Sequence, residues 1–522
     1  MFTVLSGICF GSVLSGIFCP VFVCSAIFVI GIFDTPAMEQ QRYDDFHPRW
    51  ADHVVCVLKP LLATLPRICK PILQVHVWSD CAGLCTEMIA AREVERAVRD
   101  HIGVDVKFVL NGACDQCPHS KKFVIQNFAP VHWADSINND RHHDTGHYVD
   151  TIGDKPVVGQ LPSVGIDLYV AGWPCGPFSH RGKRKRSDDP AGHIVWSVIG
   201  AIAFMKPALF ILENVVAVQE ASPDNFWDAV QARVKSDLPN YTIVTLSGTT
   251  PLSHGYPTAR TRMKLIGARN DVCGTEKMHT VLNLLVSNPL PVDRDWQSLL
   301  GLCASRHPDW GQNDPIAFID RKTTCMCCTD PMTYCQVHPC NCRDCREIAK
   351  MPNRGINAAG CVWRRNALEF MNKYCDKMIR DEYDNKVASY TQIVDRHGLA
   401  APQQARVRHM LNVIAAMKGM DLNTTPAIVD TSQSLDRKPW RFDGTVPPIA
   451  TNTTLWSMKL ARFLTFEHTA ALMGHRMCDV DRDFKGIRKT ARQQLIGNSI
   501  HVATLGSLIV AQLAAACPDV DT

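Results

Sequence analysis

From residue 72 onward, the chain alternates short apolar runs with stretches of helical pattern, and this rhythm limits its fold more than any other feature. We expect helices over about residues 84–100 and 192–205. The apolar runs predict strands at 72–80, 104–112, 130–135, 165–174, 208–215, 241–248 and 263–269. Because these runs are continuous, the strands should be buried on both faces. The sequence therefore predicts an α/β fold with a Rossmann-like, mostly parallel sheet and helices on both faces.

Chemically active side chains follow several of the predicted strands. They are Asp80, Asp115, Asp135, Cys175 and Glu213. The carboxyl ends of parallel strands form one edge of a sheet, and ligands bind at that edge. Asp115 is placed like the acidic residue that takes ribose hydroxyls in nucleotide-binding folds, with a solvated loop carboxylate as the alternative. The convergence of the five residues predicts a site at this edge.

Cys175 lies in the segment Pro174-Cys175-Gly176-Pro177. A proline restricts its own φ and the residue before it, so the thiol should be presented on a rigid loop. A cationic stretch follows within a few residues, and nearby positive charge favours the thiolate. Inert packing is the ordinary role of a cysteine. The neighbours of Cys175 favour a nucleophile instead.

Three charged residues accompany this thiol. Glu213 ends an otherwise apolar strand, where a carboxylate is costly to bury unless it has partners or a function. Arg260 and Arg262 stand two residues apart, so both should project from the same side of an extended segment. Either arginine alone is typical of a plain surface charge. With Cys175 and Glu213, they predict a group that attacks, protonates and clamps a planar heterocycle.

In these stretches the chain resembles the cytosine-C5 DNA methyltransferases. The matching segments follow the order of that family and read SDCAGLCTE, CDQCPHSKKF, WADSI, GWPCGPFS, ENV, GYPTARTRMKLIGAR, RFLTFEHTAALMGH and IGNSIHVATLGSLI. They cover roughly residues 73–270 and 430–516. Each segment is a weak signal by itself, whereas the ordered set is highly specific.

The resemblance implies a DNA (cytosine-5-)-methyltransferase that uses S-adenosyl-L-methionine and acts on a cytosine rotated out of double-stranded DNA. Cys175 would add to C6, Glu213 would hold and protonate N3, and Arg262 would contact the base oxygen. Arg260 would support the loop, and Asn214 belongs to the same catalytic group. One alternative is a tRNA cytosine-C5 methyltransferase of the same fold. The other is a catalytically silent DNA-binding homologue.

The resemblance also implies the cofactor site. Asp115 would hold the ribose, Asp135 the adenine, and Asn498 would tie the last helix to the cofactor and the catalytic loop. The other cofactor-binding residues expected are Asp80, Cys81, Ala82, Gly83 and Pro174.

The chain departs from the family pattern at several places. Cys81 and Cys85 occupy positions where the family carries an aromatic residue and a glycine, so the affinity for the cofactor is in question. Gly176 and Thr258 each stand where glutamine is usual, and the last motif lacks the usual prolines. None of these changes removes a chemical group that the reaction needs.

A run of positive charge follows the nucleophile. It consists of Arg181, Lys183, Arg184, Lys185 and Arg186. This segment closes over DNA in the family, so we expect it to contact phosphates. A nuclear-import signal is the alternative, the two roles are compatible, and we expect a nuclear location. The net charge of +4 is too small to identify a partner, so the DNA argument depends on this local run.

The 23 cysteines are scattered, apart from one dense group, which indicates a reducing compartment with metal or catalytic thiols rather than a disulfide framework. That group contains Cys325, Cys327, Cys328, Cys335, His338, Cys340, Cys342 and Cys345. Thiolates and an imidazole at such spacing suit tetrahedral zinc, with a metal-free cysteine-rich loop as the alternative. We expect a structural zinc in a smaller, irregular lobe.

Four segments are expected along the chain. Residues 1–37 form an apolar segment that is a membrane anchor, a signal or a gene-model artefact ahead of a true start at Met38. Residues 38–270 should form the catalytic, cofactor-binding domain. Residues 271–430 should form the target-recognition region, with the Cys-rich insert at 325–345, and residues 431–522 should return to complete the catalytic domain.

Overall fold

The structure is a computed structural model of the 522-residue chain. It describes residues 48–65, 72–137, 141–142, 147–153, 155–162, 165–179, 182, 184–221, 224–293, 296–297, 407, 410–411, 413–414, 427–460 and 462–517. The N-terminal apolar segment, Arg181, Lys183 and the whole cysteine-rich insert lie outside the described residues.

A seven-stranded sheet forms the centre of the molecule, in the order β3-β2-β1-β7-β8-β10-β9. Its strands are β1 (Ile72–Asp80), β2 (Asp105–Cys114), β3 (His132–Ala134), β7 (Leu168–Ala171), β8 (Leu209–Val215), β9 (Tyr241–Thr249) and β10 (Arg262–Arg269). Strands β3, β2, β1, β7 and β8 pair in parallel, and β10 runs antiparallel to both of its neighbours. The predicted mostly parallel sheet is therefore confirmed.

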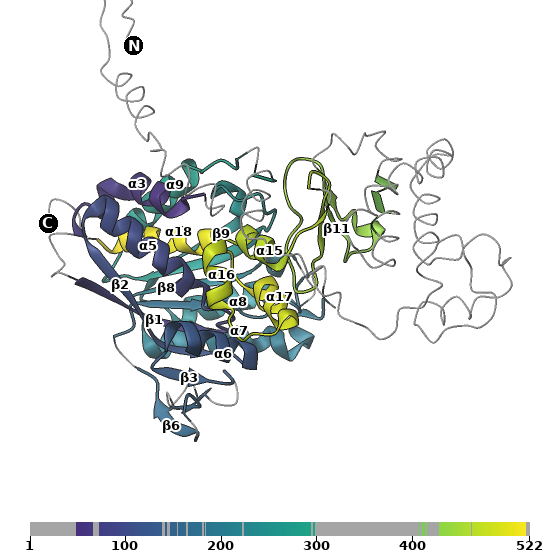
Figure 1. Cartoon of the computed structure of the whole chain (residues 1–522). Helices are drawn as coiled ribbons and strands as arrows, with labels where there is room; N and C mark the ends of the chain where they lie inside the picture. The colour runs from purple at the N-terminus through teal and green to yellow at the C-terminus, as the bar shows by residue number, and fades with distance from the viewer. Residues whose placement is uncertain are drawn as a thin grey trace, which may run out of the picture.

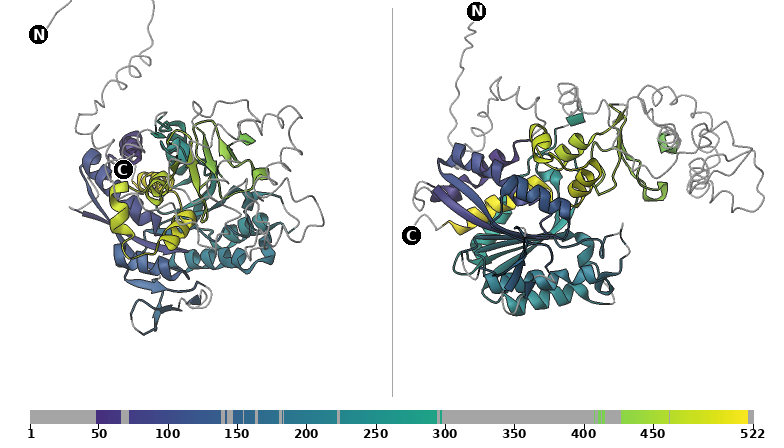
Figure 2. Two further views of the ribbon diagram at one scale, coloured as in Figure 1. Left: turned by 45° about the vertical axis from the view of Figure 1, so that its right-hand side comes forward. Right: turned by 60° about the horizontal axis from the view of Figure 1, so that its bottom comes forward.

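Helices cover both faces of this sheet (Figures 1 and 2). One face carries α3 (Trp50–Leu62), α5 (Thr86–Ile102), α9 (Thr275–Ser287) and α18 (Val502–Ala516), and the other carries α7 (Ile194–Met205) and α8 (Phe226–Asp237). The pleat of β8 shows the division, because Leu209 and Ile211 face the first core while Phe210 and Leu212 face the second. This alternation also decides which face each charged residue at the strand ends occupies.

The C-terminal segment packs against the N-terminal half of the chain. Helices α15 (Phe466–Leu472), α16 (Met477–Asp483) and α17 (Lys489–Asn498) lead to α18, and α6 (Pro118–Phe128) packs against α16 and α17. The Gln512 side chain on α18 donates hydrogen bonds to the carbonyls of Phe210 (2.9 Å) and Gly267 (3.1 Å). Gly506 allows close packing, since a Cβ there would lie 2.0 Å from the Trp50 ring. The sheet and the last helix therefore form one core.

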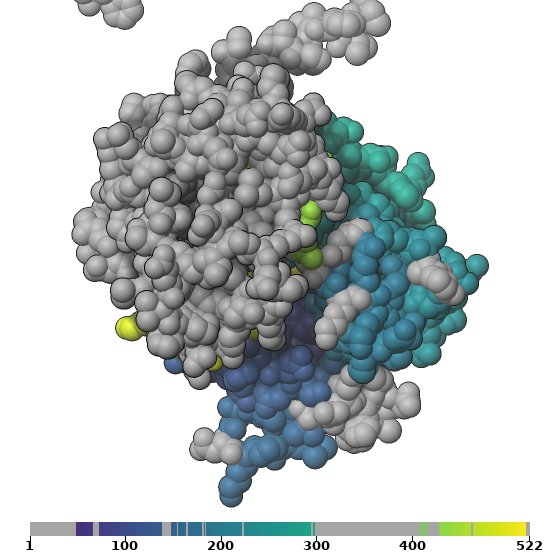
Figure 3. Space-filling model, turned by 90° about the vertical axis from the view of Figure 1, so that its right-hand side faces the viewer, coloured from purple at the N-terminus to yellow at the C-terminus, as the bar shows by residue number. Residues whose placement is uncertain are grey.

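Two smaller sheets flank this core. The first has the order β12-β11-β13-β14, with β11 (Ile428–Asp430), β12 (Trp440–Arg441), β13 (Leu455–Ser457) and β14 (Arg462–Phe463). The second has the order β4-β5-β6, with β4 (Arg141–His142), β5 (His147–Asp150) and β6 (Val157–Gln160), and it projects beyond the main sheet (Figures 1 and 3). The four-stranded sheet spans the expected boundary at residue 430, and α9 packs with elements that precede residue 270.

Short 3-10 helices connect several of these elements. They are η2 (Arg186–Asp188), η3 (Pro190–His193), η4 (Val216–Gln219), η5 (Pro251–Ser253) and η7 (Leu435–Arg437). Within the described part of the chain, no single helix has both the length and the apolar composition to cross a membrane, and one bent pair, α17 with α18, meets those criteria only jointly.

Candidate active site

The predicted nucleophile lies on a loop after β7, in the middle of the sheet. Cys175 is half-buried, and its carbonyl accepts hydrogen bonds from the N–H groups of Phe178 (3.1 Å) and Ser179 (2.9 Å). These bonds close a turn that begins at Cys175. On its other side the loop is open, because no described atom lies within 4 Å of the place that a Cβ on Gly176 would take. The residue that follows Cys175 therefore lies next to free space.

Two contacts attach this loop to its surroundings. The Asn214 side chain, at the end of β8, donates a hydrogen bond to the Trp173 carbonyl (3.1 Å). Gly182 folds back on Gly176 so closely that a Cβ on residue 182 would lie 1.9 Å from the Gly176 carbonyl oxygen. Any larger residue at position 182 would push the two segments apart. Asn214 therefore positions the nucleophile loop through its backbone.

Glu213 lies on β8, the strand that pairs in parallel with β7. Only 7% of the residue is exposed, and the Nε atom of Arg262 lies 3.1 Å from its Oε1 atom. The second oxygen, Oε2, lies 3.6 Å from the place that a Cβ on Gly172 would take. The carboxyl group is therefore held beside the start of the loop that carries Cys175.

The two arginines that precede and begin β10 have different partners. Arg260 is buried and donates hydrogen bonds to the carbonyls of Ile449 (2.8 Å), Ser499 (2.8 Å) and Gly497 (3.4 Å). Arg262 pairs with Glu213 instead. Arg260 lies in the loop before β10, which begins at Arg262. The common direction of the two side chains stays a prediction. Arg260 joins the C-terminal segment to the site, and Arg262 belongs to the site itself.

Sequence reasoning missed Lys264, the residue of β10 directly opposite Glu213. Its side chain is fully buried, and its Nζ atom lies 3.9 Å from Glu213 Oε1. The signal was present, since a charged residue interrupts the apolar strand MKLIGAR just as Glu213 interrupts ILENV.

The ends of β1 and β2 meet at the expected cofactor edge. Asp115 accepts hydrogen bonds from the N–H groups of Gly83 (2.8 Å) and Cys117 (2.8 Å), one on each oxygen. Burial raises the pKa of Asp115, and the two N–H groups oppose that shift. Gly83 has a φ of 53°, and open space lies above it. A half-buried acceptor beside open backbone suits a ligand that carries hydroxyl groups.

Asp135 follows β3 on the same edge, and about half of its side chain is exposed. It accepts hydrogen bonds from Trp133 Nε1 (2.8 Å) and Lys121 Nζ (3.1 Å). Burial acts to raise its pKa, but hydrogen bonds from Thr151, Lys121 and Trp133 outweigh burial and hold the pKa below its usual value. Lys121, on α6, was not predicted. The carboxylate is thus fixed as an anion at the surface.

The loop after β1 has an unusual backbone. Cys81 and Cys85 have φ values of 51° and 45°, a region that favours glycine, and neither is a glycine. Asp80 is fully buried and accepts hydrogen bonds from Trp78 (3.1 Å) and from Tyr169. Its carboxylate is therefore engaged inside the sheet.

The Glu87 carboxyl group and the Cys85 thiol are both buried near this loop. Burial raises the pKa of Glu87 to about 7, partly offset by hydrogen bonds from Ser79 and Cys85. Burial also raises the pKa of the Cys85 thiol well above its usual value. A protonated thiol of this kind is chemically inert, so Cys85 acts through packing.

Asn498 is the last residue of α17, and it is exposed. Its role toward the cofactor stays a prediction, whereas its neighbours contact other parts of the site. A Cβ on Gly497 would lie 2.2 Å from the backbone nitrogen of Thr451, and the Ser499 carbonyl accepts from Arg260. Ile500 lies against Gly172, at the start of the nucleophile loop. The segment around Asn498 therefore reaches the catalytic loop, although through other side chains.

The described part of the basic run divides into two kinds of residue. Lys185 is exposed, and Arg184 is half-exposed with an ion pair to Glu220 at 3.7 Å. Arg186 instead donates hydrogen bonds to the carbonyls of Ala217 (3.2 Å), Val218 (3.1 Å) and Glu220 (2.9 Å). The prediction that Arg186 contacts phosphates does not fit this arrangement, because its guanidinium is used to hold η4. Lys185 and Arg184 keep their charge at the surface.

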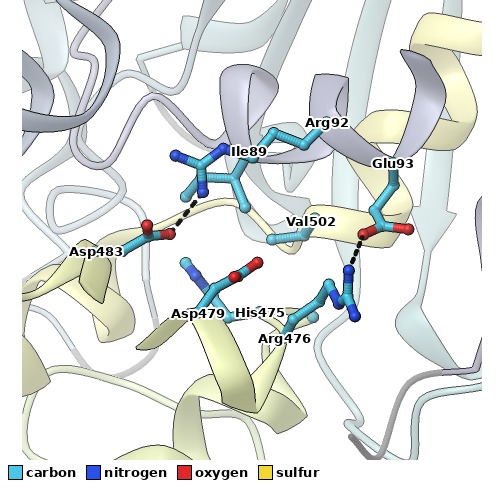
Figure 4. A pocket seen from close by; sticks show the side chains of 9 residues that line it. Ile89, Arg92, Glu93, His475, Arg476, Asp479, Asp483 and Val502 are labelled. Atoms are coloured by element: carbon cyan, nitrogen blue, oxygen red, sulfur yellow. Dashed lines mark hydrogen bonds and ion pairs between the residues drawn. The ribbon is translucent and has the colours of Figure 1, made fainter. Parts of the chain in front are cut away.

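A small pocket lies between α5 and α16 (Figure 4). Its charged side chains are paired with one another: Arg92 contacts Asp483 at 2.7 Å, and Arg476 contacts Glu93 at 3.7 Å. Burial lowers the pKa of His475, also in its wall, to about 4. This pocket contains neither Cys175 nor Glu213.

The eight expected zinc ligands lie outside the described residues, so the zinc lobe stays a prediction. Across the parts of the chain that the structure describes, no cluster of three or more His, Cys, Asp or Glu side chains is arranged to hold a metal ion.

Fold and site together define an α/β protein with a cysteine and a buried carboxylate at the carboxyl edge of its sheet. Residues 134–287 match the model of the C-5 cytosine-specific DNA methylase family. The chain is 32% identical over 107 residues to the Type II methyltransferase M.PspPI of Psychrobacter sp. (strain TA137), covering 20% of this chain and 25% of that protein. These matches confirm the resemblance to the cytosine-C5 DNA methyltransferases.

Other relatives match over limited stretches as well. The chain is 42% identical over 64 residues to the Type II methyltransferase M.HgiCII of Herpetosiphon aurantiacus, covering 12% of this chain and 14% of the relative. The chain thus spans a quarter or less of the length of these first relatives. The S. pombe Dnmt2 methyltransferase structure covers 84% of this chain and 97% of its own at 11% identity, with a TM-score of 0.35.

Proposed function

We propose that this protein is a DNA (cytosine-5-)-methyltransferase that modifies C5 of a flipped cytosine through a covalent adduct with Cys175. One observation carries the proposal. The Glu213 carboxyl group is buried beside the start of the Cys175 loop, with one oxygen held by Arg262 at 3.1 Å. A nucleophile and an acid on neighbouring strands are what covalent attack on a pyrimidine requires.

The residues act in sequence on a cytosine that has left the base stack. The Cys175 thiolate forms a bond to C6, and the electron pair of the C5–C6 double bond moves into the ring. N3 takes up a proton that Glu213 relays from water, while Arg262 supports the Glu213 carboxyl group at Oε1. Once C5 carries its new substituent, water takes the C5 proton, and the electrons of that C–H bond re-form the C5–C6 double bond. The bond between Cys175 and C6 then breaks to release the thiolate, and N3 returns its proton through Glu213. Turnover therefore needs no permanent change in the protein.

The acidic edge fits the cofactor implied by the family. Asp115 would accept hydrogen bonds from ribose hydroxyls, Asp135 would meet the adenine, and the open backbone at Gly83 would admit the ligand. S-adenosyl-L-methionine, when bound there, supplies the methyl group. The residues of this edge bind and orient, and those around Cys175 carry out the chemistry.

Double-stranded DNA is the proposed substrate, with Lys185 and Arg184 as surface cations for phosphate contact. The matching family model is that of a DNA methylase, which favours DNA over tRNA. A nuclear location is part of the proposal, because a basic run with Arg184 and Lys185 at the surface also suits an import signal.

Covalent trapping tests this function. Duplex DNA containing 5-fluorocytosine, incubated with the purified protein and the methyl donor, should yield a stable protein–DNA adduct, since fluorine cannot leave C5 as a proton. The Cys175→Ser variant should form no adduct, and Cys478→Ser, which alters an exposed cysteine on α16, should trap like the wild type. Adducts with tRNA but not with duplex DNA would show that the substrate is tRNA. No adduct with either substrate would refute the proposal.

A further inference from the structure

Lys264 is a buried cation at the centre of the proposed active site. It pairs with Glu213 across the antiparallel strands β10 and β8, so the two side chains lie on the same face of the sheet. Arg262, two residues earlier on β10, shares that face. Two cations from one strand thus converge on a single carboxylate.

Burial of this lysine is costly, and ordinary packing does not account for it. The residue has 0% exposure, and among the described residues its Nζ atom makes no hydrogen bond. Its contact with Glu213 Oε1, at 3.9 Å, is an ion pair without a hydrogen bond. A buried charge with such weak compensation lowers stability, so an apolar residue would serve the fold better. A function explains its presence.

The two oxygens of Glu213 face different surroundings. Both cations contact Oε1, Arg262 at 3.1 Å and Lys264 at 3.9 Å. Oε2 instead lies on the side of Gly172, where the nucleophile loop begins. Attraction of Oε1 by two charges fixes the rotation of the carboxyl group and leaves Oε2 directed toward the loop.

We propose that Lys264 is a positioning residue of the active site, which acts with Arg262 on Oε1 of Glu213 so that Oε2 meets N3 of the cytosine. This inference rests on the proposed function and adds to it a residue that the catalytic group did not contain. Lys264 touches neither the base nor the cofactor in this scheme, and it acts through Glu213 alone.

The arrangement gives the reaction a pH dependence. Burial lowers the pKa of Lys264 to about 8, Glu213 opposes that shift, and Arg262 and Arg260 add to it. His254, another titratable neighbour in the described part of the chain, has a pKa lowered to about 4 by burial and is therefore neutral near pH 8. Below pH 8 Lys264 is charged and holds Glu213; above pH 8 the charge is lost and the hold weakens. The rate of adduct formation should therefore fall as the pH rises through about 8.

The test measures the rate of 5-fluorocytosine adduct formation between pH 6.5 and 9.5, a range of about 1.5 units on either side of that pKa. Lys264→Met should trap about 10-fold to 100-fold more slowly than the wild type at pH 7, because the carboxyl group is misplaced, and should lose the alkaline decline. Lys264→Arg, which stays charged, should recover most of the rate and keep it above pH 8.

Lys107→Met is the matched control, because Lys107 also lies on a strand and pairs with a glutamate at 3.8 Å, yet is 63% exposed. It should behave like the wild type. A Lys264→Met protein that keeps the wild-type rate or the wild-type alkaline decline would overturn the inference. Circular dichroism of both Lys264 variants confirms folding, and Lys264→Arg decides the question if Lys264→Met is unfolded. Failure of the wild type to trap at any pH would refute the proposed function itself.

Discussion

The two halves of the same sheet edge hold their charged groups in different ways. At the ends of β8 and β10, Glu213, Arg262 and Lys264 are largely buried and contact one another side chain to side chain. At the ends of β2 and β3, Asp115 is held by two backbone N–H groups, and Asp135, about half exposed, is held by the Lys121 and Trp133 side chains. The first arrangement places charges precisely in a low-dielectric setting, and the second leaves acceptors within reach of a ligand.

This difference separates chemistry from binding. A carboxyl group that must transfer a proton needs a fixed position, which neighbouring charges provide. A carboxylate that recognises hydroxyl groups needs only free acceptor capacity, which a surface position preserves. We therefore expect substitutions in the first half to change the rate, and substitutions in the second to change the affinity for the cofactor.

The largest effect should come from Glu213→Gln. The amide cannot donate a proton to N3 in the same way, so the single-turnover methylation rate should fall by about 10²–10⁴-fold. Binding of the methyl donor, measured by calorimetry, should stay unchanged. Glu276→Gln on the exposed surface of α9 is the control. If Glu213→Gln instead weakened binding of the methyl donor and left the methylation rate unchanged, the separation of catalysis from cofactor binding would be contradicted.

Asp115→Asn should weaken binding of the methyl donor and leave the methylation rate unchanged. Each oxygen of Asp115 accepts from a different N–H group, and an amide nitrogen cannot accept, so one bond to Gly83 or Cys117 must break. The dissociation constant of the methyl donor should rise by about tenfold or more, with the rate at saturating donor retained. Asp271→Asn, an exposed aspartate paired with Arg269, should leave both quantities as they are. A fall in the saturated rate alone would contradict the comparison.

The smallest effect concerns backbone strain in the cofactor loop. Cys85 is buried with a φ of 45°, so replacing it removes packing and also changes strain. Comparing Cys85→Gly with Cys85→Ala isolates the strain, since both variants lose the thiol. The glycine variant should be more stable than the alanine variant by about 1 kcal/mol in chemical denaturation. Equal stability would show that the loop relaxes without cost.

Much of the fold followed from local pattern. The strands that form the main sheet were predicted at positions close to those observed, because continuous apolar runs of β-forming residues mark strands buried on both faces. The same patterns placed Cys175, Glu213 and Asp115 at one edge, since parallel strands end together. The sequence therefore predicted the chemical type of the site residues and the order of the strands along the chain.

The sequence pattern did not predict which residues contact one another in the folded chain. Arg260 and Arg262 are two residues apart in sequence, yet Arg260 bonds to backbone carbonyls more than a hundred residues later, and Arg262 to a strand that precedes it. Arg186 lies in a basic run of the sequence, but in the structure its guanidinium donates hydrogen bonds that hold η4. Lys264 became visible as a partner of Glu213 only through the β8–β10 register.

The sequence by itself determined which elements form and which reactive groups stand at their ends, because hydrophobic period and residue chemistry are properties of the local chain. Only the tertiary structure decided which charges are buried, which are paired, and which remain at the surface. The reason is that burial and pairing depend on the strands and helices that pack from distant parts of the chain, and the free energy of a charge depends on those neighbours.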